Sequence, residues 1–222
     1  KAVYPDSAKA IDRFMKNIKL GRSHYVSFAM TTGFRSINYT EPEYGNTALH
    51  YASAKGYPLV VEELMKYKAD PNIKNRFSNC PIHEAWNSWR MPNLAEGRAH
   101  QAELTQDILR ALLSYGADVD VQKGDGDTSL HVAARFGHMK AVKILLEFQA
   151  NHLIRNKNRQ TPQEVALEFN HAEIAHLLVS WTLIRQQYVH VDFNIQWKEF
   201  LSNYDATISS GRPVEATIFE LN

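Results

Sequence analysis

The chain has 222 residues and an even charge balance, with 25 basic and 24 acidic side chains and a formal net charge of +1. This balance provides no strong basic field, so we expect neither nucleic acid nor an anionic membrane surface as the main partner. Because no run of about 18 apolar residues occurs, we also expect no direct insertion into a membrane. A single cysteine rules out an internal disulfide and favours a reducing compartment, so we expect the cytoplasm, with the nucleus as the alternative.

Residues 1–43 predict two helices joined at Gly21. Asp6 or Ser7 can cap the first helix, and the second is expected to end at Gly33. The apolar face of the first helix recurs at helical spacing in Ile11, Phe14, Met15 and Ile18.

Four later stretches open alike, at Thr47, Cys80, Thr128 and Thr161. These openings lie 33, 48 and 33 residues apart, so one unit carries an excess over its neighbours. Each opening precedes a short helical segment and then a second apolar face at helical spacing. In the third unit that face comprises Val142, Leu145 and Leu146. A two-helix unit of this size cannot bury its own apolar face, so the recurrence predicts a stack of such units.

The excess lies in the second unit, around residues 90–104. A first helix is expected over 81–89, with Pro92 turning the chain away from it. The second helix resumes at Thr105, and a backward extension over 99–104 is an alternative. An insertion of this kind is either a neutral surface loop or a functional one. Three large apolar side chains beside it can pin it down or form a contact patch: Trp86, Trp89 and Met91.

The repeating pattern fades towards the C-terminus. Residues 181–188 can continue the last helix of the fourth unit. A further amphipathic helix is expected around 195–204, and a strand-like stretch follows over 214–221. This tail either covers the end of the stack, docks onto a partner or begins another domain.

The landmarks resemble those of ankyrin repeats, which have a 33-residue period. The chain shows the Thr-x-Leu-His opening at 47–50 and 128–131, the mid-unit Gly-His at 137–138, and the Leu-Leu…Gly-Ala-Asp ending over 112–118. The match covers roughly residues 22–180. It implies an all-α solenoid of helix–turn–helix units with β-hairpin-like connectors, in which one unit carries an insertion of about 15 residues.

The resemblance also implies a division of the chain. Residues 1–43 would form an N-terminal capping repeat, because terminal repeats meet solvent on one side. The repeats would follow over 44–76, 77–123, 124–157 and 158–180. Residues 181–222 would be a C-terminal extension or cap.

The sequence offers no convincing catalytic, cofactor or metal site. His50, His83 and His131 recur at one repeat position, and the resemblance implies that they bond backbone groups of neighbouring units instead of meeting at a metal. The acidic stretch over 118–127 lacks the calcium-loop pattern. We interpret Cys80 as a small, partly buried substitute for Thr at the opening position.

The resemblance implies a concave face that binds another protein. Carrying this face over position by position gives the candidate partner-binding residues Tyr51, Lys55, Arg76, Phe77, Glu84, Lys123, Arg135, Phe136, Arg155, Glu168 and Phe169. Trp89, beside the insertion, is a further candidate. Neighbouring positions on the same face are Ala54, Lys74, Asn87, Ser88, Asp125, Val132, Lys157, Arg159 and Val165. Since the connector positions are mostly basic, an acidic segment of the partner is expected.

The expected function is therefore that of a non-catalytic adaptor or scaffold that binds a protein partner. The alternative is a regulatory ankyrin fragment of a larger multidomain enzyme or channel. We expect the chain to be monomeric by itself or part of a larger assembly.

Overall fold

The computed structural model describes residues 7–87 and 97–187. Within these ranges all regular structure is helical, which confirms the predicted fold class. The helices in chain order are α1 (Ala8–Lys19), α2 (Ser23–Thr31), α3 (Ala48–Ala54), α4 (Pro58–Lys66), α5 (Pro81–Glu84), α6 (Gly97–Ser114), α7 (Ser129–Arg135), α8 (Met139–Glu147), α9 (Pro162–Glu168) and α10 (Ala172–Gln187).

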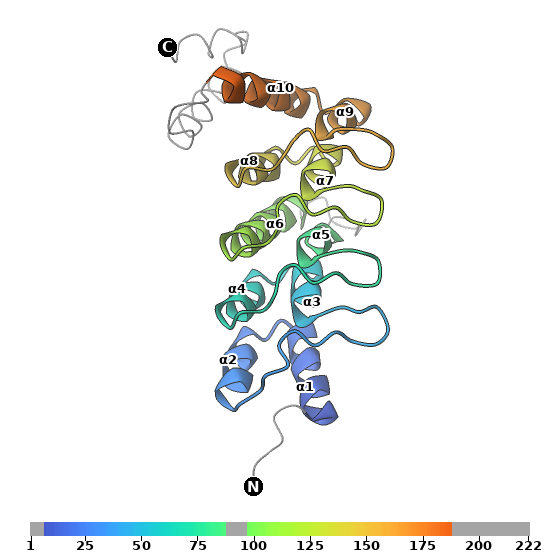
Figure 1. Ribbon diagram of the computed structural model, residues 1–222. Coiled ribbons are helices and arrows are strands. Elements are labelled where there is room, and N and C mark those ends of the chain that lie inside the picture. Colours follow the sequence, from blue (N-terminus) through green and yellow to red (C-terminus); the bar gives the residue numbers. More distant parts are fainter. Residues whose placement is uncertain (1–6, 88–96, 188–222) are drawn as a thin grey trace.

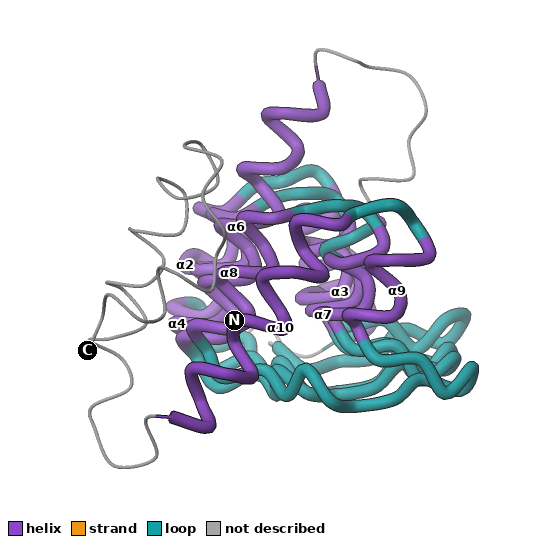
Figure 2. The backbone as a smooth tube through the Cα atoms, turned by 90° about the horizontal axis from the view of Figure 1, so that it is seen from above, coloured by secondary structure: helices purple, strands orange, loops and turns teal. Residues whose placement is uncertain are grey.

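The helices form two columns (Figure 1). The odd-numbered helices stack on one another in one column and the even-numbered helices in the other. The connectors between units all project from the same side, beyond the odd-numbered helices, and gather there in the view from above (Figure 2). We call the exposed positions of α3, α7 and α9 together with the connector tips the inner face.

The even-numbered helices bury the same position in successive units. Leu64, Leu112, Leu145 and Leu178 are all fully buried, as the helical spacing predicted. Burying each leucine stabilises the fold by about 1.5–3 kcal/mol. Since neighbouring units cover these side chains, each unit depends on the next one.

The connectors are hairpin-like loops without strands in the described part of the chain. We define four connector tips as residues 41–46, 74–79, 122–127 and 155–160. In the second, third and fourth tips the backbone N–H of the second residue bonds the carbonyl oxygen of the last residue, with N···O distances of 2.9, 3.0 and 3.0 Å. A second backbone bond closes the turn inside each of these tips, with N···O distances of 3.0, 2.9 and 2.9 Å.

The second unit differs from the prediction in its first helix. α5 ends at Glu84 and not near residue 89, because the backbone N–H of Trp86 bonds the carbonyl oxygen of His83 and tightens the helix end. The second helix, α6, starts at Gly97, so the predicted backward extension is confirmed. Residues 88–96, with Trp89 and Met91, lie outside the described residues.

Both ends of the stack carry specific contacts. Ser7 is the N-cap of α1, and its Oγ accepts a hydrogen bond from the backbone N–H of Ala10 (3.3 Å). At the other end, α10 includes the fully buried Trp181 and continues to Gln187, as predicted. Nε2 of His152 lies 2.8 Å from Oγ1 of Thr182 and ties α10 to the preceding connector. The expected amphipathic helix and strand-like stretch fall outside the described residues.

Candidate functional site

Buried histidines fix the start of three odd-numbered helices. Before α3, Nδ1 of His50 accepts a hydrogen bond from the backbone N–H of Thr47 (3.1 Å), while Nε2 lies 3.0 Å from the carbonyl oxygen of Asn79. Because a carbonyl oxygen only accepts, Nε2 carries the proton and the ring is neutral. The ring therefore joins its own helix to the following connector.

His83 and His131 repeat this arrangement. Their Nε2 atoms lie 3.0 Å from the carbonyl oxygen of Val121 and 2.9 Å from that of Gln160. The three rings thus bond the backbones of different units, as the resemblance implied. Within residues 7–87 and 97–187, no three His, Cys, Asp or Glu side chains are grouped so that they could hold a metal ion.

Several predicted partner-binding residues are exposed on the inner face. Phe77 is 61% exposed, Phe169 43% and Phe136 37%. Lys55 and Arg76 are also exposed. Exposed aromatic rings next to cations are the side-chain types that dominate protein interfaces.

Tyr51 differs from these residues because it is half-buried. Nζ of Lys19 lies 4.1 Å from the centre of its ring, a cation–π contact within the protein. Only part of the Tyr51 ring is therefore open to a partner.

Glu84 is not the surface residue that its repeat position predicted. It is 7% exposed, and its Oε1 accepts hydrogen bonds from the side-chain amides of Asn75 (3.0 Å) and Asn79 (2.9 Å). Its other carboxylate oxygen bonds the amide of Asn87. The carboxylate is thus used to hold the second connector against α5.

The same helix position is buried in the later units. Val132 is 5% exposed and Val165 0%, because the odd-numbered helices pack directly on one another along this side. Trp89, the remaining apolar candidate, lies outside the described residues.

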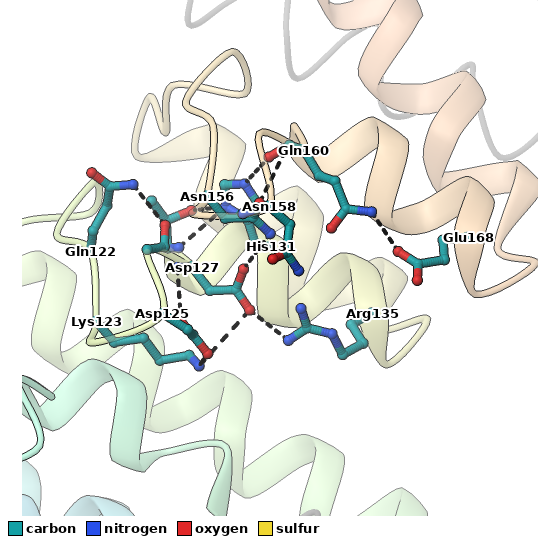
Figure 3. A network of polar contacts seen from close by, with 12 residues as sticks. Gln122, Lys123, Asp125, Asp127, His131, Arg135, Asn156, Asn158, Gln160 and Glu168 are labelled. Carbon is teal, nitrogen blue, oxygen red and sulfur yellow. Dashed lines mark hydrogen bonds and ion pairs between the residues drawn. The ribbon is translucent and has the colours of Figure 1, made fainter.

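Two basic candidates are neutralised by a buried carboxylate, Asp127 (Figure 3). Its side chain is almost fully buried, and Oδ2 lies 2.6 Å from Nη1 of Arg135 and 3.9 Å from Nζ of Lys123. Lys123 also pairs with Asp125, and Oδ1 of Asp127 accepts a hydrogen bond from the amide of Asn156 (2.8 Å). The charges of Lys123 and Arg135 are therefore balanced within the protein.

The role of Asp127 was missed from the sequence, where the acids around it were weighed only as a calcium loop. The useful signal was its place directly before an opening threonine, where the other units have uncharged side chains: Asn46, Asn79 and Gln160. A buried carboxylate is rarely left without a cation, so Asp127 required an ion-pair partner. Its partner Arg135 also lies 5.6 Å from the ring centre of Phe169 and supports that ring.

The remaining charged candidates divide into paired and unpaired groups. Arg155 pairs with Glu164 (3.1 Å), and Glu168 accepts a hydrogen bond from the amide of Gln160 (2.6 Å). By contrast, no carboxylate in the described ranges forms an ion pair with the exposed side chains Arg76, Lys157 and Arg159.

The tips also carry an aromatic pair. The rings of Tyr44 and Phe77 stack with centres 6.1 Å apart, and both side chains are exposed. Phe77 was predicted as a candidate, whereas Tyr44 was missed because only the fold brings the first and second tips together. The backbone N–H of Arg76 bonds the carbonyl oxygen of Tyr44 (2.9 Å).

Cys80 is buried, as its interpretation as a Thr substitute predicted. Its Sγ donates to the carbonyl oxygen of Asn72 (3.4 Å). Burial raises the pKa of the thiol to about 11, so the reactive thiolate is scarce near neutral pH.

Two families of known proteins match parts of this chain. The family described as "Ankyrin repeats (3 copies)" matches residues 99–188, and the one described as "Ankyrin repeat" matches residues 44–76. No helix in the described part of the chain is both long and apolar enough to cross a membrane.

Similar proteins are much longer than this chain. "SH3 and multiple ankyrin repeat domains protein 2" of Homo sapiens is 27% identical over 153 residues, covering 60% of this chain and 8% of that protein. "Tyrosine-protein kinase Shark" of Drosophila melanogaster is 27% identical over 164 residues, covering 71% and 16%. "Transient receptor potential cation channel subfamily A member 1 homolog" of Caenorhabditis elegans is 29% identical over 136 residues, covering 61% and 10%.

The chain therefore spans less than a fifth of each of these relatives. The family matches agree with the recurring openings, the two columns of helices and the histidine contacts described above. The chain belongs to the ankyrin-repeat family.

Proposed function

We propose that the chain is a non-catalytic adaptor or scaffold module that binds a protein partner on its inner face. The observation that carries the proposal is the exposure of aromatic rings on this face, with Phe77 at a connector tip and Phe169 at the end of α9. Rigid rings bury much area at little entropic cost, and such rings are frequent binding hot spots. The backbone at Phe77 is held by the buried side chain of Asn75, whose Oδ1 accepts hydrogen bonds from the N–H groups of Phe77 and Asn79.

The expected partner carries an acidic segment. Lys55, Arg76, Lys157 and Arg159 are exposed cations on or beside the same face. Unpaired surface cations steer an acidic segment during association and add specificity more than affinity. We further propose a cytoplasmic location, on the strength of the single buried cysteine.

A second candidate function is a regulatory part of a larger enzyme or channel. It is favoured by the relatives, which include a protein named as a tyrosine kinase and one named as a cation channel, each much longer than this chain. A catalytic or pore-forming domain in the same reading frame would support this candidate over the adaptor.

Affinity capture with an immobilised chain tests the proposed surface. Phe169→Ala and Arg76→Glu should each reduce recovery of the partner that the unchanged chain retains, because they remove a ring and reverse a charge on the inner face. Tyr115→Ala is the matched control, since this exposed aromatic follows the even-numbered helix α6. Equal recovery by all four chains, with unchanged circular dichroism, would contradict binding at the inner face.

A further inference from the structure

Two of the four connector tips carry cations at the same two positions. Lys74 and Arg76 lie six and four residues before the opening Cys80. Arg155 and Lys157 occupy the equivalent places in the fourth tip, before the opening Thr161. The third tip has uncharged residues at these places, Gln122 and Gly124. The positive charge therefore comes in two clusters separated by one tip.

The second and fourth tips share one conformation. Oδ1 of Asn75 accepts hydrogen bonds from the second and fourth backbone N–H groups after it (2.9 and 3.0 Å), and Oδ1 of Asn156 does the same (3.0 Å each). Ser78 and Arg159 adopt matching φ values of 61° and 62°.

Both tips are also fixed to the tip before them in the same way. The backbone N–H of Arg76 bonds the carbonyl oxygen of Tyr44 (2.9 Å), and that of Lys157 bonds the carbonyl oxygen of Asp125 (3.1 Å). Since the two backbones match, the side chains of Arg76 and Lys157 leave them in equivalent directions.

Arg76 and Lys157 are exposed and can form ion pairs with a partner, whereas the first cation of each tip has a contact within the protein. Lys74 reaches the carbonyl oxygen of Gln122 (3.4 Å), and Arg155 is paired with Glu164. In the described ranges no carboxylate pairs with Arg76 or Lys157, and Arg159 adds a further exposed cation to the fourth tip.

The first tip is acidic and marks one end of this basic stretch. Oε1 of Glu41 accepts a hydrogen bond from the backbone N–H of Tyr44 (2.7 Å), and Glu43 lies beside it. An acidic segment would therefore be attracted to the second and fourth tips and repelled by the first.

The repeat sets the distance between the two cationic clusters. Packed helices lie about 8–10 Å apart, so two repeats separate the second and fourth tips by roughly 20 Å. An extended chain advances about 3.3 Å per residue, so about six residues span this distance.

We propose that an extended acidic protein segment lies across the connector tips, with acidic groups about six residues apart facing Arg76 and Lys157. The exposed ring of Phe77 lies beside the first of these cations and packs on an apolar side chain of the same segment. The proposal rests on the proposed function and specifies the partner's chemistry and spacing.

Labelled synthetic peptides test the spacing. Each carries two Glu-Glu pairs and one Leu, with Gly-Ser spacers that place the pairs three, six or nine residues apart. Fluorescence anisotropy at low ionic strength should show the tightest binding for the spacing of six. Arg76→Ala and Lys157→Ala should each weaken it by about threefold to fivefold, as expected for exposed ion pairs. Lys140→Ala, an exposed site on α8, is the matched control.

Each outcome bears on the proposal. Equal affinity for all three spacings, or an equal loss on Lys140→Ala, would overturn it. Tighter binding of an oligouridylate than of every peptide would overturn it in favour of nucleic acid. If the double variant Arg76→Ala/Lys157→Ala still captures a partner that Phe169→Ala loses, the proposed function stands and this inference fails.

Discussion

At the scale of single residues, the repeated histidines act as neutral hydrogen-bonding groups. Burial lowers the pKa of His50, His83 and His131, and that of His83 falls from its ordinary value of 6.5 to about 4. Protonation of Nδ1 would also replace an acceptor by a donor opposite a backbone N–H. The position therefore requires an acceptor, and Glu164 meets the same requirement in the fourth unit, where its carboxylate accepts from the backbone N–H of Thr161 (2.6 Å).

This pKa shift predicts acid sensitivity. Between pH 6.5 and about 4 the unfolded chain binds a proton at His83 that the folded chain does not. The free energy of unfolding therefore decreases as the pH is lowered through this range. The stabilisation is complete above pH 6.5 and its loss is on the order of 3 kcal/mol for this site. Urea unfolding followed by circular dichroism at several pH values measures it.

The matched variant is His83→Gln, which keeps an acceptor but does not titrate. Its unfolding free energy should fall less steeply below pH 6.5 than that of the unchanged chain. A slope equal to that of the unchanged chain would show that His83 does not carry the effect.

At the scale of elements, the connectors are held in place by side-chain contacts with the units that they join. The third tip is the clearest case, because Asp127 binds Arg135 from α7 and Asn156 from the fourth tip. These contacts hold a loop that has no strand pairing of its own. They also explain why Arg135 supports the inner face without offering free charge.

The ion pair predicts an asymmetry between two variants. Arg135→Ala leaves the buried carboxylate of Asp127 without its closest cation and should cost about 3 kcal/mol of stability or more. Asp127→Asn keeps an acceptor for Asn156 and restores the residue found at Asn46 and Asn79, so it should cost about 2 kcal/mol or less. Urea unfolding of both variants measures the difference. A larger loss for Asp127→Asn would contradict this account.

At the scale of the whole molecule, each unit is covered by its neighbours along one axis. Among the described residues, interior units have two such interfaces, whereas the first and last units have one. Loss of packing at an end should therefore open only the neighbouring unit, while loss in the middle should affect both directions.

Two equivalent leucines test this behaviour. Leu112→Ala in α6 should cost about 2–5 kcal/mol and speed amide hydrogen exchange in helices on both sides. Leu178→Ala in α10 should speed exchange mainly in α9 and α10. Both side chains are fully buried in the unchanged chain, so the starting packing is matched. Identical exchange patterns would show that the stack opens as one unit.

The sequence by itself determined the repeat, its period and the buried apolar faces of the even-numbered helices. The recurrence of His50, His83 and His131 and the spacing of Leu64, Leu112 and Leu145 are local patterns, and the contacts of these residues repeat in three units. The family resemblance followed from the same landmarks, so the fold class was predictable.

Only the tertiary structure decided which inner-face residues are available to a partner. Glu84 is buried under amides from the second connector, Arg135 is neutralised by Asp127, and Tyr44 stacks on Phe77 from the neighbouring tip. Repeat position gives a side chain's place along the stack. Its exposure and pairing depend on the particular residues of the units beside it, which no single repeat specifies.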